Sequence, residues 1–313
     1  MKSTMVNQTH VEGLLYQHSL QLKTAGDNSK NPGTQFINGT IDIATDDALT
    51  NIVTIHFTYV TPKYAKSGSD NATFATLQNI INGVTCNVMD HGADKAAKVR
   101  IDSAIGLNEF YSNRTGTDEL VSVKRNEGGF VHIVQTLASD EKTRNTFKCD
   151  MVITGATRIE ADEDKGRPEQ VKVKGYIFDF RKALLPVEFT AVNKGAMDYF
   201  EDLDASMANP CFTQVWGRQL SQTTMTKTVT ESAFGEPMVT ETPRTNRDFV
   251  ITGASKEPYI WDDESTITAQ EFKAAQADRE VAVAAIKQRQ DEYNASRNQT
   301  TPVTTTAASG FNF

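Results

Sequence analysis

The sequence has few cysteines and no long apolar run. Cys86, Cys149 and Cys211 are its only three cysteines in 313 residues, and they lie far apart with no CxxC pair. An odd number at such spacing is typical of reduced thiols and argues against a disulfide or zinc framework. No stretch reaches the roughly 18 apolar residues of a membrane helix, and the first ten residues lack the basic and apolar parts of a secretory signal. We therefore expect a soluble, cytoplasmic protein.

Signatures of common enzyme classes are also missing. The patterns GxxxxGK[ST], GxSxG and HExxH do not occur, and no two of the five histidines lie closer than eight residues in the sequence, which leaves metal ligation by dispersed residues as the alternative. Asp42, Asp46 and Asp47 form an apparent carboxylate cluster, but paired aspartates between two strands are typical of turn chemistry. The sequence therefore predicts a protein without catalytic activity, cofactor or metal.

Cations are outnumbered in the chain. There are 32 Lys and Arg against 40 Asp and Glu, which leaves a net charge of −8. Phosphate binding rests on clustered cations, so this balance argues against a nucleic-acid ligand. However, seven of the 40 carboxylates fall in two short stretches, 160–164 and 262–264. This distribution allows a basic groove on an acidic molecule, and it allows equally a mixed, solvated surface.

Alternation of apolar and polar residues, the pattern of β-strands, is abundant. In the first half it predicts strands within 10–23 and at 36–44, 51–60, 99–111, 120–125 and 129–134. Asn71, followed by apolar residues at helical spacing, predicts a capped helix at 72–81. The second half repeats this order, with strands expected at 147–160, 171–180, 184–192 and 212–221, later strands beyond them, and a short helix at 196–203 after the third strand.

Two segments of the chain are similar to other segments of it. The stretches NGTIDIATDDALTNIVTIHFTYV and KGYIFDFRKALLPVEFTAV share a glycine-led strand, a short turn and a second strand, a likeness that β-rich segments can also reach by chance. A sharper repeat relates CDMVITGATR from Cys149 to RDFVITGASK from Arg247. We interpret both as duplication of one β-module.

A module of five strands with a helix between the third and fourth resembles the OB-fold, a small Greek-key barrel. The chain as a whole resembles bacteriophage or prophage single-stranded DNA-binding proteins with tandem OB-like modules, although SH3-like barrels and β-sandwiches remain alternatives. The expected fold is mainly β. It consists of a first OB-like module at 8–140, a second at 144–260, a long C-terminal helix at 266–297 and a flexible tail at 298–313.

The resemblance implies a sequence-independent, non-catalytic protein for phage-type DNA replication or recombination in a bacterial host cell, with single-stranded DNA as its partner. Binding of this kind needs aromatic faces for bases and cations for phosphates. The stretch VSVKRNEGGFVHI, which we expect at a hairpin tip, is the strongest individual candidate. For each aromatic residue, packing in the core is the alternative. The candidates are Tyr59, Lys63, Tyr64, Lys66, Phe110, Tyr111, Arg114, Lys124, Arg125, Phe130 and His132 in the first module, and Tyr176, Phe178, Arg181, Lys182, Trp216 and Arg218 in the second.

The C-terminal part has a different composition. Residues 268–297 contain no Gly or Pro and are rich in helix-forming residues, with only a thin apolar stripe that suits packing on a domain or a partner helix. The Thr-rich tail then contains Phe311 and Phe313, which we expect to enter a pocket on a replication or recombination protein, and a terminus without a role is the alternative. Two other functions remain open, a protein-interaction or virion component without nucleic-acid binding, and a hydrolase or nuclease with scattered carboxylates.

Overall fold

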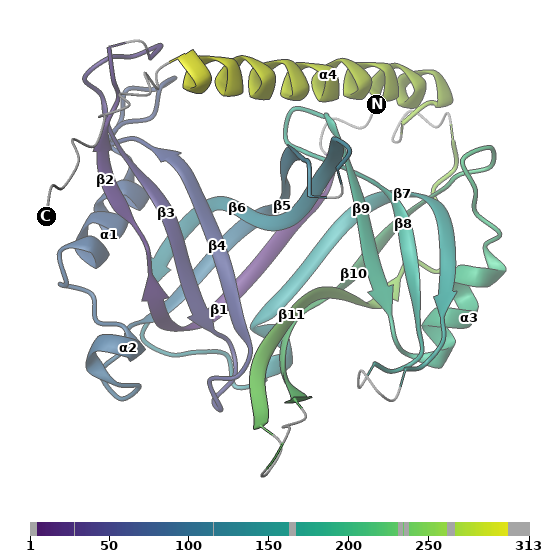
Figure 1. Ribbon diagram of the computed structural model, residues 1–313, viewed down its shortest axis with the longest axis horizontal. Coiled ribbons are helices and arrows are strands. Elements are labelled where there is room, and N and C mark those ends of the chain that lie inside the picture. Colours follow the sequence, from purple (N-terminus) through teal and green to yellow (C-terminus); the bar gives the residue numbers. More distant parts are fainter. Residues whose placement is uncertain are drawn as a thin grey trace, which may run out of the picture.

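The chain forms one hydrogen-bonded sheet of eleven strands that closes on itself twice, as the computed structural model shows (Figure 1). The structure describes residues 5–27, 29–114, 116–162, 167–230, 234, 238–261 and 267–299. Of the carboxylate-rich stretches, Glu163, Asp164 and residues 262–264 lie outside these ranges, as do Phe311 and Phe313 of the tail. No helix among the described residues is long and apolar enough to cross a membrane.

Five strands form the first ring. They are β1 (Asn7–His18), β3 (Gln35–Ala44), β4 (Ile52–Val60), β5 (Lys98–Ser112) and β6 (Glu119–Ile133). The pairs β1–β3, β3–β4, β5–β6 and β1–β5 are antiparallel, and a parallel β4–β6 pair closes the ring. The short β2 (Gln21–Thr24) adds to the edge of β3, so the segment expected as one alternating run is two strands.

The same connectivity returns in the second ring. Its strands are β7 (Asn145–Ile159), β8 (Gln170–Phe178), β9 (Leu184–Ala191), β10 (Cys211–Thr230) and β11 (Met238–Ala254). Antiparallel pairs link β7–β8, β8–β9, β10–β11 and β7–β10, and a parallel β9–β11 pair closes the ring. In both rings a helix lies between the third and fourth strands. The prediction of a mainly β chain with two tandem OB-like modules is therefore confirmed.

The helices between the third and fourth strands begin at asparagine caps. In the first ring α1 (Ala72–Ile81) starts after Asn71, whose side chain accepts from the Thr73 backbone N–H, and a single-turn helix, α2 (Val88–His91), follows it. In the second ring Asn193 caps α3 (Lys194–Asp202) in the same way. An asparagine oxygen satisfies one of the free N–H groups of a first helical turn, so the predicted cap at Asn71 is confirmed.

Each ring encloses its own apolar core. In the first, Ile41, Ile55 and Ile101 are fully buried. In the second, the rings of Phe147, Phe189 and Phe249 lie within 5.0–5.8 Å of one another. Full burial of such side chains is worth about 1.5–3 kcal/mol each. The rings are joined because β1 pairs with β5 on one side and with β7 on the other, and a short 3₁₀ turn (Glu141–Thr143) precedes β7.

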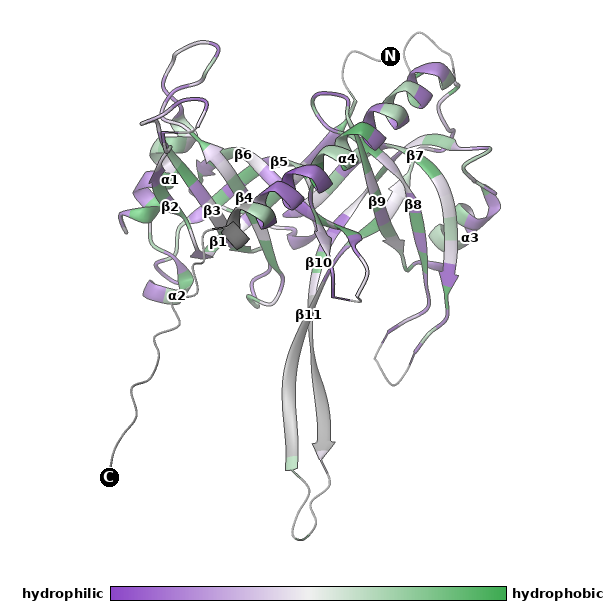
Figure 2. Ribbon diagram, turned by 45° about the horizontal axis from the view of Figure 1, so that its top comes forward, coloured by the Kyte–Doolittle hydropathy of each residue, from purple (hydrophilic) through white to green (hydrophobic). Residues whose placement is uncertain are grey.

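The long helix α4 (Ala269–Gln299) lies across both rings (Figures 1 and 2). Its first turn is anchored in the second ring, where Phe272 is buried beside Phe212 and Ile267. Farther along, Arg279 forms an ion pair with Glu109 of β5. The predicted helix is confirmed. Of its expected apolar stripe, Phe272 and Ala275 pack against the second ring, whereas Val281 is 70% exposed.

The stretch VSVKRNEGGFVHI is not a hairpin tip. It lies inside β6, which pairs with β5 over its whole length except for a bulge between Asp102 and Ala104. At this bulge Gly128 and Gly129 have positive φ values of 65° and 117°. A Cβ on Gly129 would lie 2.5 Å from the Asp102 carbonyl oxygen, so glycine lets the strand continue.

The VITGA repeat does not relate one module to the other. Its two copies lie in β7 and β11, which are both strands of the second ring, and they flank β10. The repeated connectivity of the two rings is what supports duplication, and it depends on strand order rather than on shared residues.

Thiol reactivity provides a test of the second core. Cys149 is fully buried, and burial raises the pKa of its thiol well above the usual value, with Asp150 adding to the effect. Cys86 and Cys211 are half-buried. Because the thiolate is the reactive form, we expect an aromatic disulfide reagent at about pH 8 to label Cys86 fastest in the folded protein, Cys211 more slowly since burial raises its pKa as well, and Cys149 only in guanidinium. Rapid labelling of Cys149 in the folded state would contradict this packing.

Candidate nucleic-acid interface

A row of outward-facing side chains crosses five neighbouring strands and both rings. Register places Arg218 opposite Thr146, Thr146 opposite His10, His10 opposite Asp102, and Asp102 opposite Phe130. Directly paired residues of antiparallel strands share a face, so all five lie on one surface. At about 4.8 Å per strand, the row is about 19 Å long.

Aromatic and cationic side chains flank this row. Trp216 on β10 is paired with Lys148 on β7, and Arg100 on β5 is paired with His132 on β6. We call the row together with Trp216, Lys148, Arg100 and His132 the outer strip. Phe130 is 59% exposed and Trp216 39% exposed, so each can present a ring face to a ligand. The strip passes over a hollow of about 620 Å³ lined in part by His10, Phe130 and Lys148.

The charge of the outer strip is positive on balance. It carries Arg100, Lys148 and Arg218 against Asp102, which lies 2.7 Å from Nδ1 of His10. A second carboxylate on this face, the largely buried Glu12, lies opposite Arg100 in register and 3.6 Å from Nε2 of His10. Within the described part of the chain, no carboxylate forms an ion pair with Arg100 or Lys148, and the Nε of Arg218 donates to Asn145 Oδ1 at 3.1 Å. A local cationic surface therefore exists on a chain whose net charge is −8.

A second aromatic cluster adjoins the strip on the first ring. Tyr59, Tyr64 and Phe130 line one hollow of about 280 Å³ beside the closing β4–β6 pair. Tyr59 is 47% exposed and its ring lies 4.5 Å from that of Phe36. The exposed Lys63 and Lys66 belong to the same loop as Tyr64. The structure thus brings together five of the residues predicted from the sequence.

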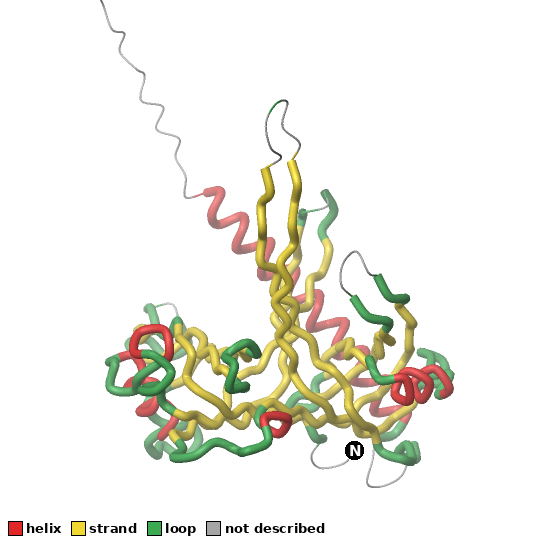
Figure 3. Tube along the Cα trace, turned by 90° about the horizontal axis from the view of Figure 1, so that it is seen from below, coloured by secondary structure: helices red, strands yellow, loops and turns green. Residues whose placement is uncertain are grey.

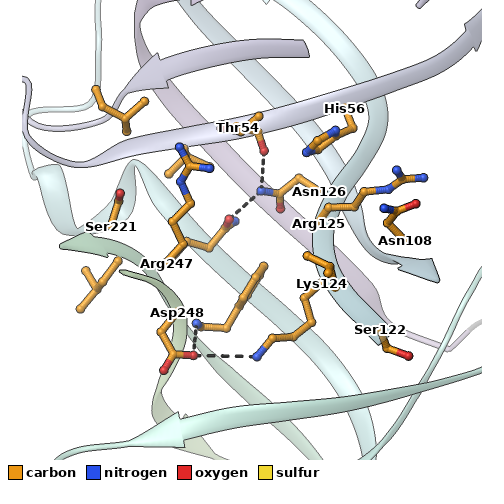
Figure 4. Close-up of a pocket in the computed structure, with 16 residues that line it drawn as sticks. Thr54, His56, Asn108, Ser122, Lys124, Arg125, Asn126, Ser221, Arg247 and Asp248 are labelled. Atoms are coloured by element: carbon orange, nitrogen blue, oxygen red, sulfur yellow. Dashed lines mark hydrogen bonds and ion pairs between the residues drawn. The ribbon is translucent and has the colours of Figure 1, made fainter. Parts of the chain in front are cut away.

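A groove of about 530 Å³ separates the two rings (Figure 4). Its walls come from β4, from β6 and from the β10–β11 ribbon, which extends away from both rings (Figures 1 and 3). Arg125 and Arg247 lie at the groove, and Arg125 pairs with Glu127. His56 also lines it, and burial together with the nearby Arg125 charge lowers the pKa of this imidazole.

Lys124 enters the second ring rather than solvent. Its Nζ donates to the Glu188 carbonyl oxygen, lies 3.8 Å from Asp248, and is 5.5 and 5.6 Å from the ring centres of Phe189 and Phe249. Burial lowers the pKa of Lys124, an effect that Asp248 opposes. The predicted phosphate contact is therefore occupied by protein groups, and Lys124 joins the two rings.

The family comparison covers most of the chain: the family model described as YorF matches residues 6–289. The chain belongs to the YorF family. Comparison with curated proteins found no match. Among solved structures, this YorF-family chain is similar to a deletion mutant of the single-stranded DNA binding protein from Thermus aquaticus, with 8% identity, a TM-score of 0.47, and coverage of 83% of this chain and 98% of that chain.

Several predicted residues lie away from the outer strip. Phe178 is fully buried and packs edge-on against Phe212, so it has no face for a base. Tyr176 packs edge-on against Phe272 of α4. At Tyr176 and Phe178 both faces of β8 are covered, because the alternate residues Val173 and Ile177 fill the barrel core. Alternation along the strand did not show whether Tyr176 and Phe178 or their neighbours Val173 and Ile177 are covered. Both pairs are covered because α4 packs over the face that carries Tyr176 and Phe178.

Two other groups of predicted residues also lie outside the strip. The ends of β5 and β6 meet α4, where Gln290 bonds to both the backbone N–H and the carbonyl of Tyr111, and Lys287 lies 4.9 Å from the Tyr111 ring. Phe110 and Arg114 are exposed nearby. Arg181 and Lys182 are exposed in the β8–β9 turn.

Five residues of the outer strip are not among those predicted from the sequence: His10, Arg100, Asp102, Thr146 and Lys148. Each is an isolated polar residue in an alternating strand, and only the pairing of β7, β1 and β5 brings them together. One of them could have been found from the sequence. Lys148 lies between the apolar residues Phe147 and Cys149, which are buried, and alternation along a strand places it on the outward face.

The aspartate pair of the β3–β4 connection behaves as turn chemistry. Asp46 accepts from the Thr50 hydroxyl and from the backbone N–H groups of Thr50 and Asn51, the two backbone bonds at 2.9 Å, and these bonds lower the pKa of its carboxyl against the opposing effect of burial. Among the described residues, no group of three or more His, Cys, Asp or Glu side chains is placed to hold a metal ion.

Proposed function

We propose that this chain binds single-stranded DNA without sequence preference and without catalysis. The observation that carries the proposal is the outer strip, where Phe130 and Trp216 are exposed on the same surface as Arg100, Lys148 and Arg218. Bases stack on exposed aromatic rings, and phosphates are held by cations beside them. Such stacking is tolerant of sequence because every base has a π-face.

The biological setting is part of the same proposal. The resemblance of the sequence to phage-type proteins supports a role in DNA replication or recombination inside a bacterial host cell. In this role the strand lies across both rings, with the Tyr59, Tyr64 and Phe130 cluster extending the path on the first ring. The tail that ends in Phe311 and Phe313 recruits a replication or recombination protein.

Salt-dependent binding tests the proposal. The anisotropy of a labelled dT oligomer should rise with the full-length protein, and the logarithm of the association constant should fall linearly with that of the salt concentration. Each phosphate contact in a single strand contributes about −0.7 to the slope, so the three strip cations predict a slope of about −2.

Removal of one strip cation should change that slope. In Lys148→Ala it should become shallower by about 0.7, whereas Lys256→Ala, at an exposed lysine outside the strip, should leave it unchanged. Absence of any salt-sensitive binding would instead favour a protein-interaction role.

A further inference from the structure

The β10–β11 ribbon continues beyond the rings as two strands without further neighbours. β10 pairs with β7 only from Cys211 to Arg218, and the parallel β9–β11 pairing is at Val250. Farther out, residues 222–230 and 238–246 pair with each other and with no other described strand. Figure 3 shows this part of the ribbon projecting from the body of the molecule. An isolated two-stranded hairpin is marginally stable in water, so an additional strand would stabilise the ribbon.

The side chain of Asn51 occupies the start of the free edge of β10. Its Nδ2 donates to the Gln219 carbonyl oxygen at 3.2 Å, and its Oδ1 accepts from the Ser221 backbone N–H. These two residues therefore direct their backbone groups away from β11. The register with β11 is regular from Gly217 to Thr230, and backbone groups point to alternate sides along an antiparallel strand. Four further residues thus present their N–H and C=O groups to the same edge: Thr223, Met225, Lys227 and Val229.

The other edge of the ribbon is closed to a further strand. Met225 is paired with Pro243, so the outward nitrogen of β11 at this point belongs to a proline and carries no hydrogen. Residues 238–246 also include Glu241 and Arg244, whereas residues 222–230 include five threonines, the single charge of Lys227 and no proline. Proline and charges oppose strand addition at an edge, and threonine favours it. The edge of β10 is therefore the open one.

One open and one closed edge in each chain suit pairing with a second copy of this chain. Antiparallel pairing of two identical edges about a two-fold axis matches N–H with C=O groups, and the outward residues of two strands form about eight hydrogen bonds. A foreign strand would leave its own outer edge unpaired, whereas a second copy ends the sheet with β11 and its Pro243. We infer that two copies join along β10 into a four-stranded sheet in the order β11–β10–β10–β11. The pairing needs no DNA.

Sedimentation velocity of the full-length protein without DNA tests the dimer. Wild type should be largely dimeric at about 100 µM, where contacts of micromolar affinity are occupied. Met225→Pro removes one donor from each open edge, and the loss of two hydrogen bonds should weaken association about thirtyfold. The matched control is Glu241→Pro, which removes an outward N–H from the closed edge of β11, and this variant should remain as dimeric as wild type.

Hydrogen exchange of the wild-type protein, followed residue by residue by NMR, decides the question if Met225→Pro fails to fold. The outward amides of β10 should exchange more slowly at about 100 µM than at about 1 µM, because only the dimer pairs them. The outward amides of β11, at Val239, Glu241 and Thr245, should exchange equally fast at both concentrations. A protein that is monomeric at both concentrations would overturn the inference. A dimer that Met225→Pro leaves intact, or in which the β10 amides gain no protection, would overturn it as well.

Discussion

Replacing Trp216 and Phe130 together with alanine is expected to weaken binding of a dT oligomer about a hundredfold. Each base stacked on an aromatic ring contributes about 1–3 kcal/mol, so each single variant should lose about tenfold. The two side chains lie on β10 and β6, at opposite ends of the strip. Because residues this far apart act independently, the losses should multiply.

The control for the double variant is Phe180→Ala. Phe180 is the most exposed of the described aromatic side chains outside the β10–β11 ribbon, and it lies in the β8–β9 turn away from the strip. Its removal should leave affinity unchanged. Thermal unfolding of each variant shows whether the protein is intact, and surface truncations of this kind should change stability by about 1 kcal/mol or less. Equal losses of dT affinity in Phe180→Ala and in the double variant would contradict the assignment of the outer strip as the binding surface.

Lys124→Ala is expected to destabilise the protein by about 3 kcal/mol, the usual cost of truncating a long buried side chain. The substitution removes the contacts with Phe189 and Phe249 and leaves a cavity where the rings meet. Asp248 keeps Lys172 at 2.9 Å, so its charge stays paired. Denaturant unfolding measures the change. Lys174→Ala, at an exposed lysine on β8, is the matched control and should cost about 0.5 kcal/mol or less.

The variant also distinguishes a structural lysine from one that contacts phosphate. Below its melting temperature, folded Lys124→Ala should bind dT with nearly the wild-type salt slope. If the salt dependence of dT binding becomes shallower while the stability stays unchanged, Lys124 contacts DNA.

Because burial lowers the pKa of Lys124, the unfolded chain holds this proton to higher pH than the folded protein does. Wild type should therefore gain stability relative to Lys124→Met as pH rises toward the ordinary lysine pKa of about 10.4.

Local patterns predicted many of the elements. Alternation located β3, β4, β8 and β9 nearly to the residue, and Asn71 predicted the start of α1, because parity and caps depend only on neighbouring residues. The mistaken hairpin tip in β6 shows the limit of that reasoning. Glycine pairs occur in turns and in bulges alike, and only the partner strand β5 decides between them.

The amino-acid sequence by itself determined that this chain is a mainly β protein with two similar modules and a long polar helix, since strand periodicity and helix propensity are written in short segments. Tertiary structure alone decided which aromatic and cationic residues share a surface. Strand register brings His10, Lys148 and Trp216 together on one surface. Phe178 and Lys124 are not available to a ligand because both are packed against other protein groups. Register and packing join residues far apart in the chain, and no local pattern specifies them.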